Sequence, residues 1–226
     1  GFINGLGYDQ SDYQNSRGNG IGELRRTSDW VRIGMAADTA DYQLINADGD
    51  LVRADEVDYL GQQAGYTADP QENIAYVSAH DNETLFDDNQ LKLPLSTSMD
   101  DRIRVQNLSN ALVLLGQGIP FIHAGQEMLR SKSMDRDSFN SGDWYNAIDW
   151  QFMDNNWGKG LPPAEKNQDR WPLMAPLLAN PTLAADGVDI QNSVERFKEL
   201  LRIRNSSKLF RLTTGQQIRD CLLYTS

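Results

Sequence analysis

The sequence is poor in cysteine and histidine and lacks long apolar runs, and these absences exclude several classes of function. It contains a single cysteine, Cys221, so an internal disulfide is excluded. Its two histidines are 43 positions apart and lack a tight carboxylate cluster, so we expect no metal site. No apolar run approaches the roughly 20 residues that span a bilayer. A glycine-rich phosphate loop and a Gly-x-Ser-x-Gly motif are also absent.

Positive charge is scarce as well. The chain has 21 Lys and Arg residues against 32 Asp and Glu residues, a net charge of −11. Nucleic acids and anionic membrane surfaces bind basic faces, so we expect neither as the main partner. The hydrophobic content of 39% is enough for a packed core and argues against global disorder.

The two ends of the sequence suggest a fragment. The start, "GFINGLGYDQ", has neither an initiator Met nor a helix cap. The codons TGT CTC TTA TAC ACA TCT encode the last residues, "CLLYTS", and resemble a transposon end used in sequencing libraries. We therefore expect residues 221–226 to be a translated adapter, with an ordinary terminal strand as the alternative.

Short apolar runs alternate with longer helical patterns in the second third of the chain. The runs "IAYVS" (74–78) and "IPFIHA" (119–124) are typical of buried strands. Upstream, "TSDWVRIGMAADTADYQLI" predicts a short helix and then a short strand, and "NADGDLVRADEVDY" predicts a turn between extended pieces. Strands that alternate with helices predict parallel βαβ units.

Two amphipathic helices are predicted. Ser98, with Asp101 three residues later, predicts the start of the first, and Gly116, Gly118 and Pro120 predict its end. Its inward stripe should comprise Leu108, Ala111, Leu112 and Leu115. The second helix, "NSVERFKELLRIRNSS", should bury Val194, Phe197, Leu200 and Leu201.

Both histidines follow the predicted strands. His80 comes just after the first run, beside Asp81, and His123 closes the second. Functional residues of a parallel α/β barrel lie at the carboxyl ends of its strands, so both histidines are expected near one mouth. Asp81 can stabilise positive charge, position a sugar hydroxyl, or merely cap the turn "DNET" with His80 packed beside it. For His123 we expect a hydrogen-bonded structural role.

Tryptophans gather in the irregular stretch 125–190, which holds Trp144, Trp150, Trp157 and Trp171. Aromatic rings beside Asn, Asp and Arg suit sugar recognition. The alternative, which we favour for any single tryptophan, is that the ring packs the loop onto the rest of the fold.

Motifs spread along the chain resemble one family. "YVSAHDN" resembles the fourth signature region of the α-amylase superfamily, and "GIPFIHAGQE" resembles the segment on its eighth barrel strand. "LRSKSMDRDSFNSGDWYNAIDW" and "GYTADPQENIAYVSAHDNETLFD" resemble pullulanases, the members that cut α-1,6 links. The resemblance is most specific over about residues 60–160.

This resemblance implies an α/β fold, an incomplete (β/α)8 TIM barrel truncated at both ends. "IAYVS" would be strand seven and "IPFIHA" strand eight, each followed by its helix. Residues 1–205 would be the C-terminal portion of the catalytic barrel. Residues 206–220 would start a C-terminal β domain.

The resemblance also assigns site residues. Asp81 would be the superfamily's third acidic residue, a catalytic side chain that stabilises the transition state, and His80 would bind the same sugar. The next sugar subsites would be lined by Arg136, Asp137, Asn140 and Asp143. The family's nucleophile aspartate and acid/base glutamate lie upstream of Gly1, so we expect this chain alone to be inactive.

The activity implied for the whole protein is a retaining glycoside hydrolase that cleaves α-1,6 branch links in pullulan, starch or glycogen. An α-1,4-acting amylase, an isoamylase-like enzyme and a non-catalytic carbohydrate-binding domain are the alternatives. The partner would be an α-glucan. Many relatives use calcium, although the sequence shows no complete ligand set, and many are exported, which suggests an extracellular or cell-surface location.

Overall fold

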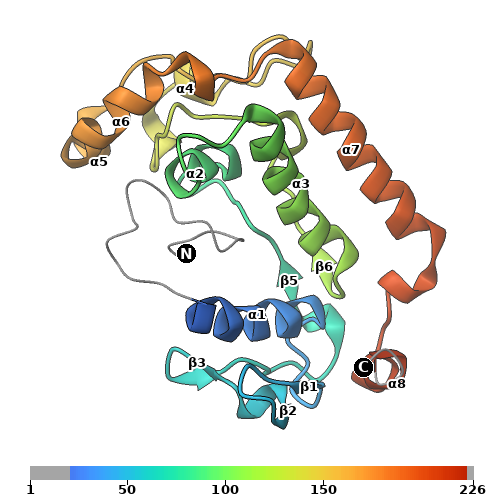
Figure 1. Ribbon diagram of the computed structural model, residues 1–226. Coiled ribbons are helices and arrows are strands. Elements are labelled where there is room, and N and C mark those ends of the chain that lie inside the picture. The colour runs from blue at the N-terminus through green and yellow to red at the C-terminus, as the bar shows by residue number, and fades with distance from the viewer. Residues whose placement is uncertain (1–20, 223–226) are drawn as a thin grey trace. The chain divides into compact units, whose positions relative to one another are not determined.

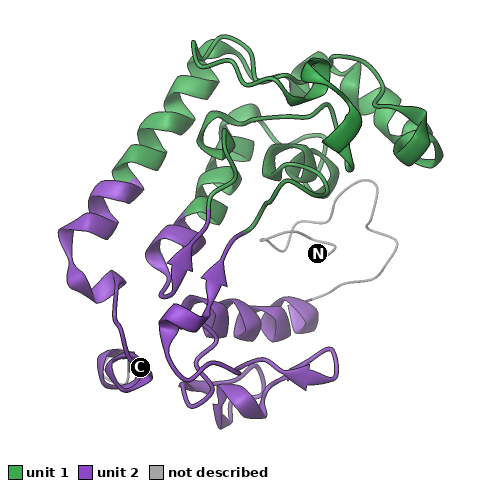
Figure 2. Cartoon of the chain, turned by 180° about the vertical axis from the view of Figure 1, so that it is seen from behind, with its two compact units in different colours: residues 1–18, 77–110, 122–199 green, residues 19–76, 111–121, 200–226 purple. Residues whose placement is uncertain are grey.

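A computed structural model describes residues 21–222 and divides the chain into two compact units (Figure 2). The described part of unit 1 comprises residues 77–110 and 122–199. Unit 2 comprises, within the described chain, residues 21–76, 111–121 and 200–222. The first 20 residues of the predicted segment 1–205, and residues 223–226 of the predicted adapter tail, lie outside the described residues.

Unit 1 consists of helices joined by long loops. Its elements in chain order are α2 (Leu85–Lys92), α3 (Met99–Leu115, of which residues 99–110 belong here), η4 (Gln126–Met128), η5 (Ser138–Asn140), α4 (Asp143–Asn146), α5 (Ala164–Asn167), η6 (Gln168–Arg170), α6 (Trp171–Leu178), η7 (Pro181–Leu183) and α7 (Gly187–Ser206, as far as residue 199).

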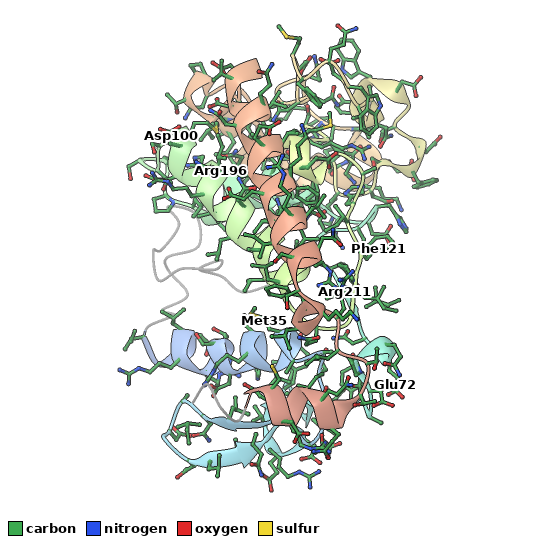
Figure 3. All side chains as sticks on the ribbon, turned by 90° about the vertical axis from the view of Figure 1, so that its right-hand side faces the viewer. Met35, Glu72, Asp100, Phe121, Arg196 and Arg211 are labelled. Atoms are coloured by element: carbon green, nitrogen blue, oxygen red, sulfur yellow. The ribbon has the colours of Figure 1, made fainter. Side chains whose placement is uncertain are left out.

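The apolar core of unit 1 joins these elements. It contains Phe86, Leu91, Ile103, Met128, Leu129, Met134, Trp157, Met174, Leu177, Leu183, Ile190 and Val194. In α7 the predicted inward residues Val194 and Phe197 are buried, whereas Leu201 is 44% exposed. The outward face of α7 is charged: Arg196, labelled in Figure 3, is exposed, and its guanidinium lies 3.2 Å from the Glu199 carboxylate. The predicted apolar face of this helix is therefore confirmed only in its first half.

Helix α3 begins and ends where the sequence predicts. The Ser98 Oγ accepts a hydrogen bond from the Asp101 backbone N–H at 3.2 Å and donates one to its carboxylate at 2.9 Å. The helix ends at Leu115, and Gly118 just beyond it has φ of 85°. A left-handed φ of this size favours glycine.

The buried face of α3 differs from the predicted one. Leu108 is 48% exposed and the other three predicted stripe residues are only partly buried. Several of the buried positions are polar: Arg102, Gln106 and Asn110 have exposed fractions of 1%, 1% and 0%. The buried apolar residues of the helix are Ile103, Val113 and Leu114, none of which belongs to the predicted stripe. α2 and the first part of α3 lie side by side (Figure 1), and the Asn89 side-chain amide donates to the Gln106 side-chain oxygen at 3.0 Å. The stripe prediction was wrong because hydrogen-bonded polar side chains share the inward face with Ile103, so the hydrophobic pattern alone does not mark that face.

Unit 2 contains short strands and helices. Its elements are α1 (Ile21–Met35), β1 (Gln43–Ile45), β2 (Leu51–Arg53), η2 (Ala54–Glu56), β3 (Asp58–Tyr59), β4 (Gln62–Gln63), η3 (Pro70–Glu72), β5 (Ile74–Ala75), residues 111–115 of α3, β6 (Ile119–Pro120), residues 200–206 of α7, η8 (Lys208–Phe210) and α8 (Gly215–Leu222). The predicted helix, strand and turn over residues 27–59 are confirmed by α1 and by the antiparallel pair β1–β2.

Aromatic and small residues hold unit 2 together. The Trp30 ring packs edge-on against Tyr59 with 4.6 Å between centroids, and its indole N–H donates to the Asp58 carbonyl at 2.8 Å. Ile218 of α8 is fully buried with Ala36 and Ala37. These contacts tie α1 to the β3–β4 hairpin and tie α8 to the residues that follow α1.

The predicted incomplete (β/α)8 barrel is wrong. Among the described residues the structure forms three two-stranded sheets, and only β5–β6 is parallel, with two residues in each strand. A barrel needs eight parallel strands, each paired on both sides. The barrel prediction assumed that the two apolar runs form buried strands. Their side chains are exposed instead: the exposed fractions of Ile74, Tyr76, Ile119 and Phe121 are 48–58% (Figure 3 labels Phe121). The described chain is mainly helical.

The segment predicted to start a C-terminal β domain, residues 206–220, contains η8 and most of α8 in the structure, and no strand is assigned there. The side chain of Ile218 packs on Ala36 and Ala37 just after α1, and the Gly215 N–H donates to the Asp69 carboxylate at 2.9 Å. Cys221 of the predicted adapter tail is the penultimate residue of α8.

Candidate functional site

Asp81, the predicted catalytic residue, and His80, predicted to bind the same sugar, lie on an exposed turn of unit 1 just before α2. The side chains of His80 and Asp81 are 87% and 77% exposed, and the imidazole Nε2 lies 3.5 Å from the Asp81 carboxylate. Thr84 caps α2, because its hydroxyl accepts a hydrogen bond from the Asp87 N–H at 3.1 Å. The cap of this helix is therefore supplied by Thr84, and the Asp81 carboxylate faces solvent.

His123 lies close to this turn within unit 1. Its Nδ1 lies 3.3 Å from the Ser78 hydroxyl, and its Nε2 lies 3.3 Å from the Arg130 guanidinium. Burial lowers the pKa of His123 to about 4, and the positive charges of Arg130, Lys132 and His80 add to the effect. At neutral pH the ring is uncharged and accepts from Arg130, which agrees with the structural role predicted for it.

Beneath the turn, Asp87 organises a buried loop. This fully buried carboxylate accepts hydrogen bonds from the Ser131 hydroxyl at 2.5 Å, the Lys132 N–H at 2.8 Å and the Met134 N–H at 3.2 Å. Burial raises the pKa of Asp87 to about 6, although these hydrogen bonds oppose the rise. The carboxylate thus fixes the main chain of residues 131–134.

Lys132 connects this loop to the predicted catalytic turn. Its side chain is buried, with the residue 1% exposed, and its ammonium group donates a hydrogen bond to the His80 carbonyl at 3.0 Å. Burial lowers the pKa of Lys132, and the Asp87 and Asp135 carboxylates oppose this. Sequence reasoning missed both Asp87 and Lys132, because their importance depends on burial, which no local motif reveals.

The loop of residues 136–143, predicted to line further sugar subsites, is stabilised by hydrogen bonds to Asp135, another residue that the sequence did not single out. Asp135 is fully buried and accepts hydrogen bonds from the Asp137 N–H at 3.0 Å, the Ser141 hydroxyl at 2.5 Å and the Asn167 amide at 3.0 Å. The Asn167 carbonyl in turn accepts from the Arg136 N–H at 3.3 Å. These bonds shape the loop and leave outward-facing side chains at its surface.

The predicted subsite residues themselves are accessible. Arg136, Asn140 and Asp143 are exposed, and Asp137 is partly exposed, with its carboxylate 3.9 Å from the Lys166 ammonium group. Asp143 starts the short helix α4. In the part of the chain that the structure describes, no hydrogen bond or ion pair joins Asp81 to any of these four residues. The His80–Asp81 turn and the loop of residues 136–143 are therefore two exposed polar segments of the described part of unit 1, without a direct hydrogen bond or ion pair between Asp81 and the predicted subsite residues.

The tryptophans divide between packing and exposure. Trp157 packs edge-on against Phe86 in the core, and Trp171 is half-buried with its indole N–H bound to the Pro162 carbonyl. Trp144 and Trp150 are each 64% exposed. Packing thus accounts for two of the four rings, and two remain free to meet a ligand.

A hollow of about 240 Å³ lies beside the exposed Trp144 ring. Its lining residues are Asp143, Trp144, Ala147, Asp149, Asp154, Asn156 and Lys159. The Trp144 indole N–H donates to the Lys159 carbonyl at 2.8 Å, which fixes the ring. An aromatic ring beside carboxylates and an amide suits a sugar, which offers an apolar face and a rim of hydroxyls.

The described residues contain no group of three or more His, Cys, Asp and Glu side chains arranged to hold a metal ion. None of the helices found between residues 21 and 222 has the length and apolar character needed to cross a membrane.

Comparisons with known proteins identify the class. Residues 152–226 match the family described as "Alpha-1,6-glucosidases, pullulanase-type, C-terminal". The chain belongs to the pullulanase-type family, as the motifs around His80 and Arg136 indicated.

Individual relatives cover most of this chain. It is 48% identical over 198 residues to "Pullulanase 1, chloroplastic" of Arabidopsis thaliana, which is 87% of this chain and 20% of the relative. It is 40% identical over 197 residues to the pullulanase of Klebsiella aerogenes, which is 87% of this chain and 18% of that protein. The solved pullulanase of Klebsiella pneumoniae complexed with maltotriose matches 96% of this chain and 20% of its own, with 37% identity and a TM-score of 0.89. This chain therefore spans about a fifth of the length of these relatives.

Proposed function

We propose that the protein to which this chain belongs is a retaining glycoside hydrolase that cleaves α-1,6-glucosidic branch links in pullulan, starch or glycogen. The observation that carries the proposal is the 48% identity to a pullulanase across 87% of the chain. The exposed His80–Asp81 pair supports it, because the turn that carries this pair accepts a hydrogen bond from the buried Lys132 side chain. The pullulanase structure complexed with maltotriose supports an α-glucan as the substrate.

In this proposal Asp81 stabilises the transition state. Glycoside hydrolysis passes through an oxocarbenium-like state that carries positive charge on the sugar ring. A carboxylate held near that charge lowers the barrier when its interaction is stronger in the transition state than in the ground state. His80, whose ring adjoins Asp81 at 3.5 Å, would hold hydroxyls of the same sugar.

The covalent chemistry is assigned to residues outside this chain. Retaining glycosidases use a nucleophile and an acid/base whose carboxyl groups lie about 5–5.5 Å apart. We propose that both groups lie outside these 226 residues, so that the chain alone binds sugar poorly and hydrolyses nothing. Arg136, Asp137, Asn140 and Asp143 would contact neighbouring sugar units, since their side chains reach the surface of a loop braced by Asp135.

Digestion of pullulan by a longer protein that contains this chain tests the proposal. Cleavage at α-1,6 links alone yields maltotriose, whereas cleavage at α-1,4 links yields products that retain the α-1,6 bond. Maltotriose as the end product supports the proposal, and retained α-1,6 bonds would favour an α-1,4-acting amylase. Cleavage of glycogen branches without cleavage of pullulan would favour an isoamylase-like enzyme. Binding of glucan without any hydrolysis would favour a carbohydrate-binding domain.

A further inference from the structure

The buried ammonium group of Lys132 is an unusual feature of unit 1. Lysine is rarely buried in full unless it is paired, because removing its charge from water is costly. Yet Lys132 is 1% exposed, and the hydrogen bond that the structure gives its ammonium group goes to a main-chain carbonyl, that of His80, at 3.0 Å. A lysine whose role was stability alone would be expected to bind a carboxylate directly.

The base of the Lys132 side chain is held rigidly. Its backbone N–H donates to Asp87 at 2.8 Å, and the flanking Ser131 and Met134 donate to the same carboxylate. On the other side, the Ser133 hydroxyl donates to the Asn156 carbonyl at 2.8 Å. Ser133 and Met134 have φ of 50° and 65°, a left-handed conformation that persists only where surrounding contacts impose it. The loop therefore gives the ammonium group a fixed position.

The ammonium group of Lys132 contacts the exposed turn at His80. The carbonyl that it binds belongs to His80 and is part of the peptide bond that joins His80 to Asp81. Fixing this peptide limits the directions in which both exposed side chains can point. The nearby carboxylates of Asp87 and Asp135 oppose the lowering of the Lys132 pKa by burial.

We propose that Lys132 is a positioning residue whose ammonium group fixes the His80–Asp81 peptide and thereby aims both side chains at the sugar in the cleavage subsite. The proposal rests on the proposed function for the identity of the sugar. Its structural part, the control of the turn by Lys132, concerns this chain alone.

The structural part can be tested by NMR because the sequence has two histidines, which give two sets of imidazole signals. Lys132→Met keeps the length of the stem and removes the donor, and Lys132→Arg keeps a cationic donor. Leu183→Ala is the control, because Leu183 is fully buried in the same core and its truncation leaves a cavity elsewhere in unit 1. We expect the His80 signals to shift or split in Lys132→Met, to return toward wild type in Lys132→Arg, and to stay unchanged in Leu183→Ala. His80 signals that are identical in wild type and Lys132→Met overturn the proposal.

The functional part requires a longer protein with hydrolytic activity. A misplacement of about 1 Å in an active site can cost about 100-fold in rate, so we expect Lys132→Met to lower kcat on pullulan by about that factor, with KM changed far less. Leu183→Ala should lower the melting temperature and keep kcat within about threefold of wild type. An unchanged kcat in Lys132→Met would contradict the proposal. If the wild-type protein cleaves no glucan, the proposed function fails, and the NMR comparison still decides whether Lys132 controls the turn.

Discussion

Replacing Asp87 by Asn should change how the stability of the protein depends on pH. Asn keeps the size of the side chain, and its carbonyl can accept from the Lys132 and Met134 N–H groups as the carboxylate does at 2.8 and 3.2 Å. Its amide can donate to the Ser131 hydroxyl, which rotates to accept. The substitution therefore removes a titrating charge from a fully buried site with little change in packing.

The size of the effect follows from the shifted pKa. Burial raises the pKa of Asp87 from 3.8 to about 6, so the folded state binds this proton more tightly than the unfolded chain does. The unfavourable contribution of the carboxylate is therefore absent well below pH 3.8 and is complete above pH 6. A shift of about two units is worth about 3 kcal/mol, of which about 2 kcal/mol develops between pH 4.5 and pH 7.5.

Urea unfolding of the wild type and of Asp87→Asn at pH 4.5 and pH 7.5 measures this difference in stability. Tryptophan fluorescence reports on Trp157, which packs on Phe86 in the core next to Asp87. The free energy of unfolding of the wild type, relative to that of Asp87→Asn, should be about 2 kcal/mol greater at pH 4.5 than at pH 7.5. His123 and the other titrating groups are present in both proteins, so their contributions cancel. If the wild type instead lost stability relative to Asp87→Asn on acidification, the pKa of Asp87 would be lowered in the folded state. The hydrogen bonds to its carboxylate and the charge of Lys132 would then outweigh the effect of burial, and the reasoning would be wrong.

Two further substitutions test the description of α3 by chemical denaturation. Leu108→Ala should lower the free energy of unfolding by less than about 1 kcal/mol, because Leu108 is 48% exposed. Ile103→Ala, in the core, should lower it by about 2–5 kcal/mol. Equal losses would mean that Leu108 lies on the buried face, as the sequence predicted. Ser98→Ala should cost about 1 kcal/mol through loss of the bond from the Asp101 N–H, while Ser98→Asp should retain most of the stability, and an unaffected Ser98→Ala would show that the cap contributes nothing.

Local signals in the sequence predicted the elements better than their burial. Ser98 and Gly116 marked the ends of α3 correctly, because capping depends on a few neighbouring residues. The buried face of the same helix could not be read in this way. Arg102 is buried because its guanidinium reaches the Gln90 side chain at 2.8 Å and the Pro94 carbonyl at 2.6 Å, partners that are defined only by the folded chain.

The same distinction applies to the candidate site. The motif "SAHDN" led directly to His80 and Asp81, and the structure places both on one exposed turn. Asp87, Lys132 and Asp135, which hold this turn and the neighbouring loop, lie 6–55 positions away from Asp81 or His80 in sequence. They act through hydrogen bonds that only the folded chain creates. The barrel prediction failed for a related reason: two short apolar runs specify strands, but pairing on both sides of each strand is a property of the whole fold.

The most direct test of the proposed function is Asp81→Asn in a longer protein that contains this chain, with kcat on pullulan and the melting temperature measured on the same preparation. Asn keeps the size and one carbonyl acceptor but removes the negative charge. Loss of one preorganised electrostatic interaction typically lowers turnover by about 10²–10³, so we expect kcat to fall at least that far, with KM changed much less. The melting temperature should stay close to that of wild type, because the Asp81 side chain is 77% exposed. Near-normal turnover together with a clearly lowered melting temperature, the result expected of a turn cap worth about 0.5–2 kcal/mol, would contradict the catalytic role of Asp81.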